Sequence, residues 1–289
     1  ALRTLGAEIS EIGGSLLCRA ERLRGDDILL TLPSVGATEN AILAACGAEG
    51  TTIISNAARE PEIADLQDFL QKLGADVHGA GTSTITVRGG GVRRGCVHRC
   101  IGDRIAAATY LCAAAAAGGQ VTLRGVDYRH LATVTTALGQ AGCRLQCTED
   151  SITLESDGRL RAIPPVRTSP YPGFPTDAQA PLMAALLRSE GAVMFVENMF
   201  DSRYRHVPEL VRMGADIRLE GRVAVVYGTR ELHGAAVRCT DLRGGAALAI
   251  AALQTPDATL IHEIYHIQRG YQDMAGDLRA LGADAIVEV

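Results

Sequence analysis

The chain has 289 residues, of which 47% are apolar and 21% charged, and it contains 32 glycines. This composition is typical of a globular, turn-rich protein and excludes a disordered chain or a coiled coil. The net charge of −5 argues against general binding of nucleic acids, so any bound anion requires a local site. The longest apolar stretch, Ile105–Ala117, is too short to cross a bilayer, and the first ten residues lack a signal-peptide pattern.

Eight cysteines are too few for a disulfide framework in a chain of this length, which favours reduced thiols in a cytoplasm. Two pairs, Cys96 with Cys100 and Cys143 with Cys147, have a spacing that metal ligands also use. Neither has a second CxxC-type pair nearby. The sequence therefore predicts no metal site.

An internal repeat sets the architecture. A short motif that ends a helical pattern, "LGAE" or a close variant, is present at five places in the chain. Its glycines are 68, 68, 72 and 68 residues apart: Gly6, Gly74, Gly142, Gly214 and Gly282. Recurrence of a whole motif at this period indicates a repeated supersecondary unit.

Each unit contains the same predicted elements in the same order. Residues 63–73, 131–141 and 271–281 have apolar positions at helical spacing, and the following glycine is expected to end each helix. Short β-patterned runs follow at 83–89, 151–156 and 223–228. An alanine-rich run in each unit predicts a second helix, buried because it is apolar all round. The unit is β-α-β-α-β-β, and the fold class is α/β, with buried helices inside and sheets outside.

Both ends of the chain fall within a unit. The first residues match the last turn of a helix, and the final run, Ala285–Val289, predicts one strand without its hairpin. These patterns predict a preceding segment. Residues 1–102 are expected to form a partial first domain of about one and a half repeats. Residues 103–289 are expected to form a second domain of three repeats, the last without its closing strands.

Polar residues of N-cap type precede the four predicted buried helices: Ser34, Asp103, Asp177 and Asp241. Capping alone explains any one of them. Four helix N-termini in equivalent positions also offer free N–H groups to an anion. Asp177 has a second possible role, as acceptor of a hydroxyl proton.

Arginines lie close to the same helix starts: Arg59, Arg104, Arg203, Arg243 and Arg269. A surface arginine is usually only solvated. However, Arg203 and Arg269 occupy equivalent places in neighbouring units. Such a set could bind a phosphate and a carboxylate bidentately.

Several of these segments resemble one family. "LPSVGATEN", "NAAREPEI", "YPGFPTDAQA", "HVPELVRMGADI", "TDLRGGAAL" and "YHIQRGY" are similar to the UDP-N-acetylglucosamine 1-carboxyvinyltransferases, enolpyruvyl transferases that begin peptidoglycan synthesis. The resemblance covers nearly the whole chain. It implies two domains, each an inside-out α/β barrel of three repeats, with the active site in the cleft between them.

The resemblance also implies roles for individual residues. Asp177 matches the base that deprotonates the sugar 3-hydroxyl, and Arg243 and Arg269 match arginines that bind phosphoenolpyruvate. The remaining positions match substrate-binding residues of the family: Leu32, Pro33, Ser34, Val35, Gly36, Asp103, Arg104, Thr176, Met199, Phe200, Arg203 and Asp241. No metal or organic cofactor is implied. The expected partners are the two small-molecule substrates and a missing N-terminal segment or separate chain, with no nucleic acid and no membrane.

The chain departs from the family pattern at its start. A Lys-Asn pair, two arginines and the mobile loop with a Cys or Asp general acid have no counterpart here, and none of the eight cysteines can be assigned that role. The predicted function is enolpyruvyl transfer from phosphoenolpyruvate to UDP-N-acetylglucosamine, with the chain alone expected to be inactive. The alternative is a non-catalytic nucleotide-sugar-binding remnant or regulatory paralogue.

Overall fold

The computed structural model describes residues 1–92 and 94–287. They form two compact units, each with its own hydrophobic core. Unit 1 comprises Ala1–Ile101 and Pro170–Pro172, and unit 2 comprises Gly102–Ser169 and Gly173–Val289. Within the described residues, no helix is both long and apolar enough to span a membrane.

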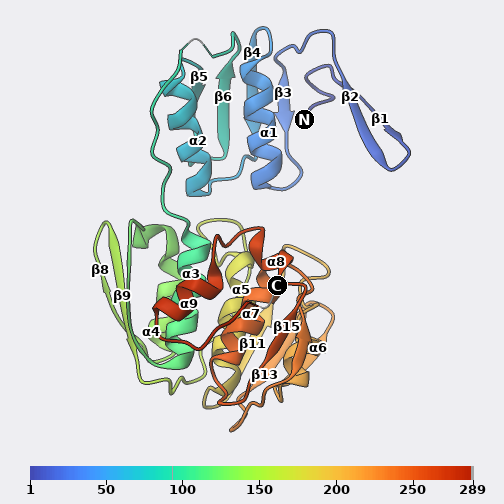
Figure 1. The fold of residues 1–289 in the computed structure, drawn as a ribbon. Helices are drawn as coiled ribbons and strands as arrows, with labels where there is room; N and C mark the ends of the chain where they lie inside the picture. Colours follow the sequence, from blue (N-terminus) through green and yellow to red (C-terminus); the bar gives the residue numbers. More distant parts are fainter. Residues whose placement is uncertain (93, 288–289) are drawn as a thin grey trace. The chain divides into compact units, whose positions relative to one another are not determined.

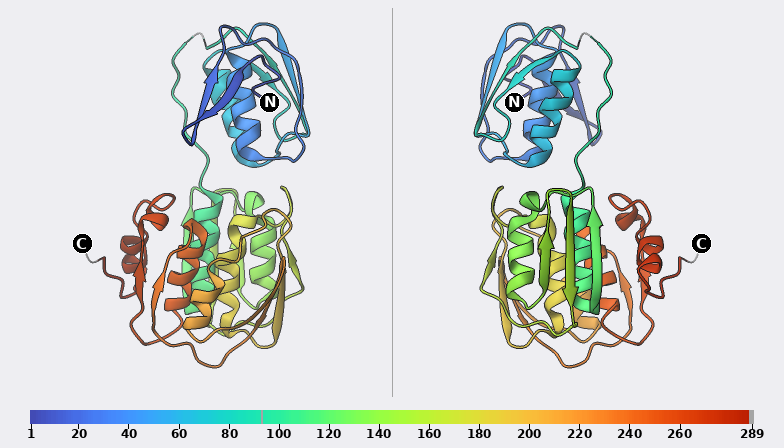
Figure 2. Two further views of the ribbon diagram at one scale, coloured as in Figure 1. Left: turned by 90° about the vertical axis from the view of Figure 1, so that its right-hand side faces the viewer. Right: turned by 90° about the vertical axis from the view of Figure 1, so that its left-hand side faces the viewer.

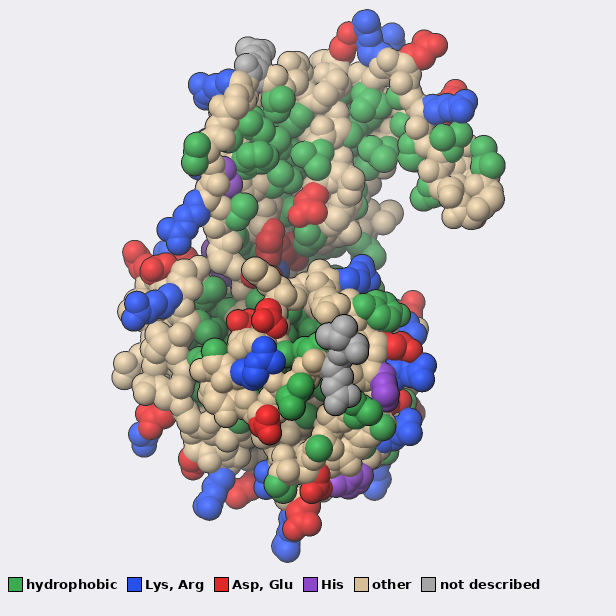
Figure 3. All heavy atoms as spheres, in the orientation of Figure 1, with side chains coloured by type: hydrophobic (Ala, Val, Ile, Leu, Met, Phe, Trp, Pro, Cys, Tyr) green, Lys and Arg blue, Asp and Glu red, His purple; other side chains and the backbone are tan. Residues whose placement is uncertain are grey.

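Unit 1 combines a four-stranded sheet with two helices and a separate hairpin (Figure 1). Its elements are β1 (Glu8–Ile12), β2 (Ser15–Arg19), β3 (Asp27–Leu29), α1 (Val35–Cys46), β4 (Thr51–Ser55), α2 (Pro61–Lys72), β5 (Asp76–His78) and β6 (Thr84–Arg88). Strands β1 and β2 form a two-stranded sheet of their own among the described residues, and Ile12 and Leu16 of this hairpin are 62% and 72% exposed. Figure 3 shows apolar side chains at the surface of this hairpin.

Unit 2 places three helices, α3 (Arg104–Ala117), α5 (Thr176–Ala185) and α7 (Leu242–Ala252), in mutual contact at its centre. Its strands lie outside these helices (Figure 2). They are β7 (Gly119–Arg124), β8 (Arg144–Cys147), β9 (Ser151–Ser156), β10 (Val166–Arg167), β11 (Ala192–Val196), β12 (Asp216–Glu220), β13 (Val223–Tyr227), β14 (Ala236–Arg238) and β15 (Leu260–His262). The other helices are η1 (Tyr128–Leu131), α4 (Ala132–Gln140), η2 (Leu186–Arg188), α6 (Val207–Arg212), α8 (Tyr265–Gln268) and α9 (Met274–Ala280).

The repeat is present twice in complete form. The strand orders β3-β4-β6-β5 and β10-β11-β13-β12 are the same, with a parallel first pair and antiparallel pairs after it. Isolated parallel bridges, Arg24 with Glu49 and Arg161 with Glu190, lie beside both first pairs. The predicted β-α-β-α-β-β unit and α/β class are therefore confirmed.

The five repeat glycines all end a helix or turn in the left-handed region, with φ between 91° and 114°. A side chain with a Cβ rarely adopts this conformation, which explains why glycine recurs at these positions.

The described strands of unit 2 form three separate sheets, which agrees with the prediction of sheets outside the buried helices. Two local expectations need correction. In the second repeat, from α3 to β9, no initial strand among the described residues pairs with β7. The strand predicted at Ala285–Val289 is absent from residues 285–287, which form neither helix nor strand, and residues 288–289 lie outside the described part.

Candidate active site

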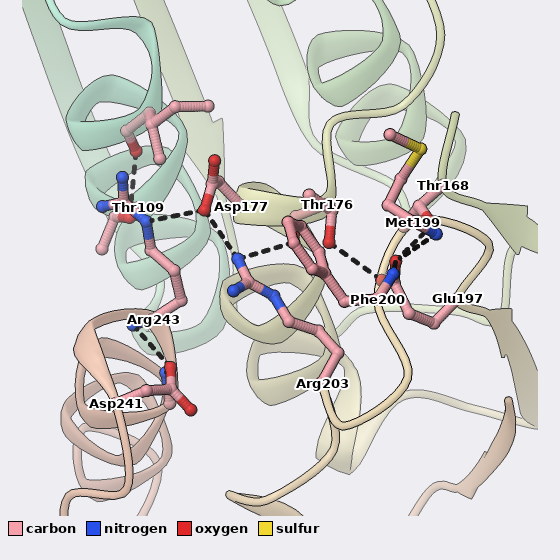
Figure 4. A network of polar contacts seen from close by, with 12 residues as sticks. Thr109, Thr168, Thr176, Asp177, Glu197, Met199, Phe200, Arg203, Asp241 and Arg243 are labelled. Carbon is pink, nitrogen blue, oxygen red and sulfur yellow. Dashed lines mark hydrogen bonds and ion pairs between the residues drawn. The ribbon is translucent and has the colours of Figure 1, made fainter. Parts of the chain in front are cut away.

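A carboxylate lies between two guanidiniums at the N-terminal ends of α5 and α7 (Figure 4). Asp177 Oδ1 is 2.6 Å from Arg203 Nη2 and 3.3 Å from Arg243 Nε. The arginine side chains are 18% and 14% exposed, whereas that of Asp177 is 43% exposed. One carboxylate therefore holds two largely buried cations and remains accessible to solvent.

Asp177 does not cap its helix, so the capping prediction is wrong at this position. The N-cap of α5 is Pro175, which makes Asp177 the second helical residue. The side chains of Ser34, Asp103 and Asp241 do cap α1, α3 and α7, as predicted. Asp177 is thus the one carboxylate of the predicted set whose oxygens are directed to arginines instead of backbone N–H groups.

The pKa of Asp177 lies below its usual value. Burial alone would raise it, but the charges of Arg243 and Arg203 and their hydrogen bonds together outweigh that effect. Asp177 is therefore ionised at neutral pH. A carboxylate with a lowered pKa becomes a better proton acceptor when its cationic partners move to another anion.

A tyrosine supports Arg243 from the other side. Tyr271 lies 3 residues before α9 and is 3% exposed. Its hydroxyl accepts a hydrogen bond from Arg243 Nη1 at 3.1 Å and lies 2.8 Å from Thr109 Oγ1 of α3. Tyr271 is not among the residues predicted from the sequence, although it lies two residues after Arg269 in the same motif.

Glu197 is a second residue of the site that was not predicted from the sequence. It is 1% exposed, and its carboxylate accepts hydrogen bonds from the hydroxyls of Thr168 and Thr176 at 2.9 and 3.0 Å. It also accepts hydrogen bonds from the backbone N–H groups of Met199 and Phe200 at 2.8 and 3.1 Å. Glu197 thereby ties the loop after β11 to the start of α5. The signal was an acidic residue directly after a buried strand in "AVMFVEN".

This loop brings Phe200 to Arg203. The guanidinium carbon of Arg203 is 5.4 Å from the ring centroid of Phe200, within the range of a cation–π contact. Phe200 is 53% exposed. An exposed aromatic ring and an exposed carboxylate therefore contact the same arginine.

Arg269 is not part of this network. It follows α8 as its C-cap, where its backbone N–H donates to the Ile267 carbonyl, and it is exposed. Its side chain makes no hydrogen bond or ion pair with another residue in the described part of the chain. Arg104 is 8% exposed as the first residue of α3, directly after its cap Asp103.

The five residues predicted to bind the nucleotide lie in unit 1 at the start of α1. Ser34 Oγ accepts a hydrogen bond from the Ala37 N–H at 3.3 Å, and Leu32 is 65% exposed. Pro33 lies in the turn before the helix and is partly exposed, whereas Val35 and Gly36 are the first two residues of α1, partly exposed and exposed. Such a turn can accept hydrogen bonds from, or donate them to, a ligand without rearranging the helix.

Comparison with known proteins assigns the family. Residues 1–278 match the family described as EPSP synthase (3-phosphoshikimate 1-carboxyvinyltransferase). The fold and the match define the class, and the chain belongs to the EPSP synthase family of enolpyruvyl transferases.

More particular similarity points to one branch of that family. The chain is 46% identical over 285 residues to UDP-N-acetylglucosamine 1-carboxyvinyltransferase 2 of Caldanaerobacter subterraneus, covering 99% of this chain and 68% of the relative. It is 46% identical over 286 residues to the UDP-N-acetylglucosamine 1-carboxyvinyltransferase of Zymomonas mobilis, covering 98% and 67%. The chain thus spans about two thirds of the length of these relatives.

Solved structures agree on the fold. The enolpyruvyl transferase NikO from Streptomyces tendae superposes with a TM-score of 0.88 at 28% identity, covering 98% of this chain and 70% of that one. EPSP synthase from Acinetobacter baumannii has a TM-score of 0.73 at 21% identity, covering 99% and 70%, and supports the fold alone.

Proposed function

We propose that this chain carries the acceptor-activating part of an enolpyruvyl transferase that moves enolpyruvate from phosphoenolpyruvate to the 3-hydroxyl of UDP-N-acetylglucosamine. The relatives that carry this activity in their names are 44–48% identical to the chain. The observation that carries the proposal is Asp177, an ionised and accessible carboxylate held between Arg203 and Arg243. This arrangement suits a proton acceptor next to a site for anions.

The proposed reaction has two stages. In the addition, the 3-hydroxyl oxygen bonds to C2 of phosphoenolpyruvate, Asp177 accepts the hydroxyl proton, and an acid protonates C3. In the elimination, C3 loses a proton and the bond from C2 to the phosphate oxygen breaks, which releases inorganic phosphate and restores the double bond. Arg243 and Arg269 would bind the charged groups of phosphoenolpyruvate throughout.

Substrate binding would also change Asp177. A phosphate or carboxylate that takes over hydrogen bonds from Arg243 removes part of what lowers the Asp177 pKa. The base would therefore gain proton affinity when the donor substrate is bound. Tyr271 and Thr109 would keep Arg243 oriented during this exchange of partners.

The other matched residues would bind the nucleotide sugar. We assign residues 32–36 to the uridine diphosphate, Met199 and Phe200 to the walls of the sugar-nucleotide site, and Thr176, Arg203, Asp241, Asp103 and Arg104 to its polar surroundings. Unit 1 would belong to the N-terminal catalytic domain and unit 2 to the C-terminal one. The C3 acid has no candidate among the matched residues, so we expect the 289-residue chain alone to release no phosphate above background.

We place the protein in the cytoplasm with its two small-molecule substrates, without nucleic acid, membrane or cofactor. All eight cysteines are free, which suits a reducing compartment.

The test is Asp177→Asn in the protein at the full length that its gene encodes. Asparagine keeps the shape of the side chain but cannot accept the hydroxyl proton. We expect turnover, measured as phosphate release with both substrates, to fall on the order of 10²-fold or more. Binding of UDP-N-acetylglucosamine, measured by calorimetry, should weaken only modestly. The matched control is Asp216→Asn on the exposed start of β12, which should keep turnover.

Near-normal turnover in Asp177→Asn would assign the proton to another acceptor. A wild-type protein that binds the nucleotide sugar but never releases phosphate would instead support the non-catalytic alternative.

A further inference from the structure

The segment from Arg94 to Ile101 lies beside α2 in unit 1 and forms neither helix nor strand (Figure 1). The Arg94 N–H donates to the Leu73 carbonyl at 3.2 Å, and Arg94 Nε donates to the Lys72 carbonyl at 2.8 Å. The segment contains "CVHRC", in which Cys96, His98 and Cys100 occupy alternate positions. Potential metal ligands are therefore held beside a helix.

The helix supplies a third type of ligand. Asp65 Oδ1 of α2 is 3.0 Å from His98 Nε2, and the Cys100 sulfur completes a group whose ligand atoms all lie within 4.8 Å of one another. The side chains of His98 and Asp65 are 7% and 17% exposed, whereas Cys100 is exposed. Within the described residues, this is the one group of three or more His, Cys, Asp or Glu side chains so placed.

A ligand set of thiolate, imidazole and carboxylate binds zinc in preference to magnesium or calcium. Zinc–ligand bonds of about 2.0–2.3 Å place neighbouring ligands roughly 3–4 Å apart. The Asp65–His98 pair is already at this separation, and Cys100 can approach by side-chain rotation because it is exposed. The Cys96 sulfur lies outside the group.

We propose that Asp65, His98 and Cys100 form a zinc site with a fourth position open to water. The site would fix the segment that leads to Gly102 onto α2. It is independent of the proposed transferase residues, since none of its ligands belongs to that set.

Lys72, the single lysine of the chain, modulates this site. Its Nζ lies 3.0 Å from His98 Nδ1. An ammonium donates to Nδ1 and keeps the ring proton on Nε2, the atom that faces Asp65. Zinc binding to Nε2 requires the proton on Nδ1 instead, where an acceptor would stabilise it. Because Lys72 is exposed, its side chain can move away from His98. Until it does, it opposes the binding of zinc.

The experiment titrates the metal-free, phosphine-reduced 289-residue chain with Co²⁺ as an optical probe. We expect a thiolate-to-cobalt charge-transfer band that Zn²⁺ abolishes by displacement. Cys100→Ser should remove the band and weaken Zn²⁺ binding by at least about 10-fold, and Cys96→Ser, the matched control, should keep both. Lys72→Gln places an acceptor next to Nδ1 and should tighten Zn²⁺ binding by roughly 10-fold.

Three outcomes would overturn the proposal. These are a wild-type chain without the band, a band that survives in Cys100→Ser, and a band that Cys96→Ser removes equally. Unchanged or weaker Zn²⁺ binding in Lys72→Gln would refute Nε2 of His98 as the ligand atom. Circular dichroism of each variant confirms that the fold is kept.

Discussion

The two complete repeats share strand order but differ in the burial of their central helix. In unit 2, every residue of α5 from Ala178 to Ala185 is buried, because α3 and α7 contact it. In unit 1, the main contacts of α1 among the described residues are with its own sheet and α2. Its buried residues are Thr38, Ala41, Ile42, Ala45 and Cys46.

Aligned positions make the difference concrete. Glu49 and Glu190 form equivalent isolated bridges in the two repeats. When the two repeats are aligned on these residues, Leu43 of α1 corresponds to Ala184 of α5. Leu43 is 52% exposed, whereas Ala184 is fully buried. The repeat thus determines which residues can form a buried helix, and the number of neighbouring repeats determines which of them are buried.

The largest expected effect comes from the core of the enclosed helix. Met183→Ala should destabilise unit 2 by about 2–5 kcal/mol, because the fully buried side chain leaves a cavity between packed helices. Leu43→Ala in α1 should change stability by less than about 0.5 kcal/mol, since half of the side chain is already in water.

Hydrogen exchange of the α5 and α1 amides measures each unit separately, which a single melting curve would not. Similar losses in the two variants would mean that α1 is covered in solution and that the contrast between the repeats is absent.

A second difference lies just before the amphipathic helix of each repeat. When Pro61 is aligned with Pro208, Arg59 and His206 occupy equivalent positions. Arg59 is exposed, whereas His206 is only 1% exposed. Neither ring nitrogen of His206 has a hydrogen-bond partner among the described residues. Burial lowers the pKa of His206 to about 4, with Asp241 opposing and Arg203 adding to the shift.

This shift predicts an acid-sensitive unit 2. Above pH 6.5, His206 is neutral in the folded and the unfolded chain. Below pH 6.5 the unfolded chain binds a proton that the folded chain refuses until about pH 4, so stability falls across that window. The loss is on the order of 3 kcal/mol. His206→Leu should flatten the stability of unit 2 between pH 6.5 and 4, measured by urea unfolding.

Arg59→Leu at the aligned position is the control, and it should leave the slope in this window unchanged. A wild-type slope retained in His206→Leu would assign the acid sensitivity to carboxylates instead.

The smallest expected effect concerns the helix caps. The Asp103 side chain accepts hydrogen bonds from two backbone N–H groups of α3 at 2.8 and 2.9 Å. The Ser34 side chain accepts a single hydrogen bond from a backbone N–H group of α1, at 3.3 Å. Asp103→Ala should therefore cost about 1–2 kcal/mol and Ser34→Ala about 0.5 kcal/mol. Thermal unfolding of these variants and of Asp103→Asn, which keeps the cap, tests the order. A larger loss in Ser34→Ala would show that the turn before α1 is fixed by more than its cap.

Much of the candidate site could be named from the sequence, but its geometry could not. Asp177, Arg203 and Arg243 were identified from motifs, whereas the support from Tyr271 and Glu197 depends on packing between distant segments. In the structure, a Cβ at Gly245 would lie 2.7 Å from Ile267 Cγ1, so this glycine permits close packing of α8 on α7.

The sequence by itself determined the repeat, the helix ends and the alternation of buried and amphipathic helices. These properties are local, because a glycine at positive φ or an apolar face at helical spacing acts within a few residues. Only the tertiary structure decided that Asp177 binds two arginines rather than capping α5, and that Asp65 of α2 meets His98 and Cys100. Such groups come from residues 26 to 66 positions apart, whose side chains meet only when the helices pack.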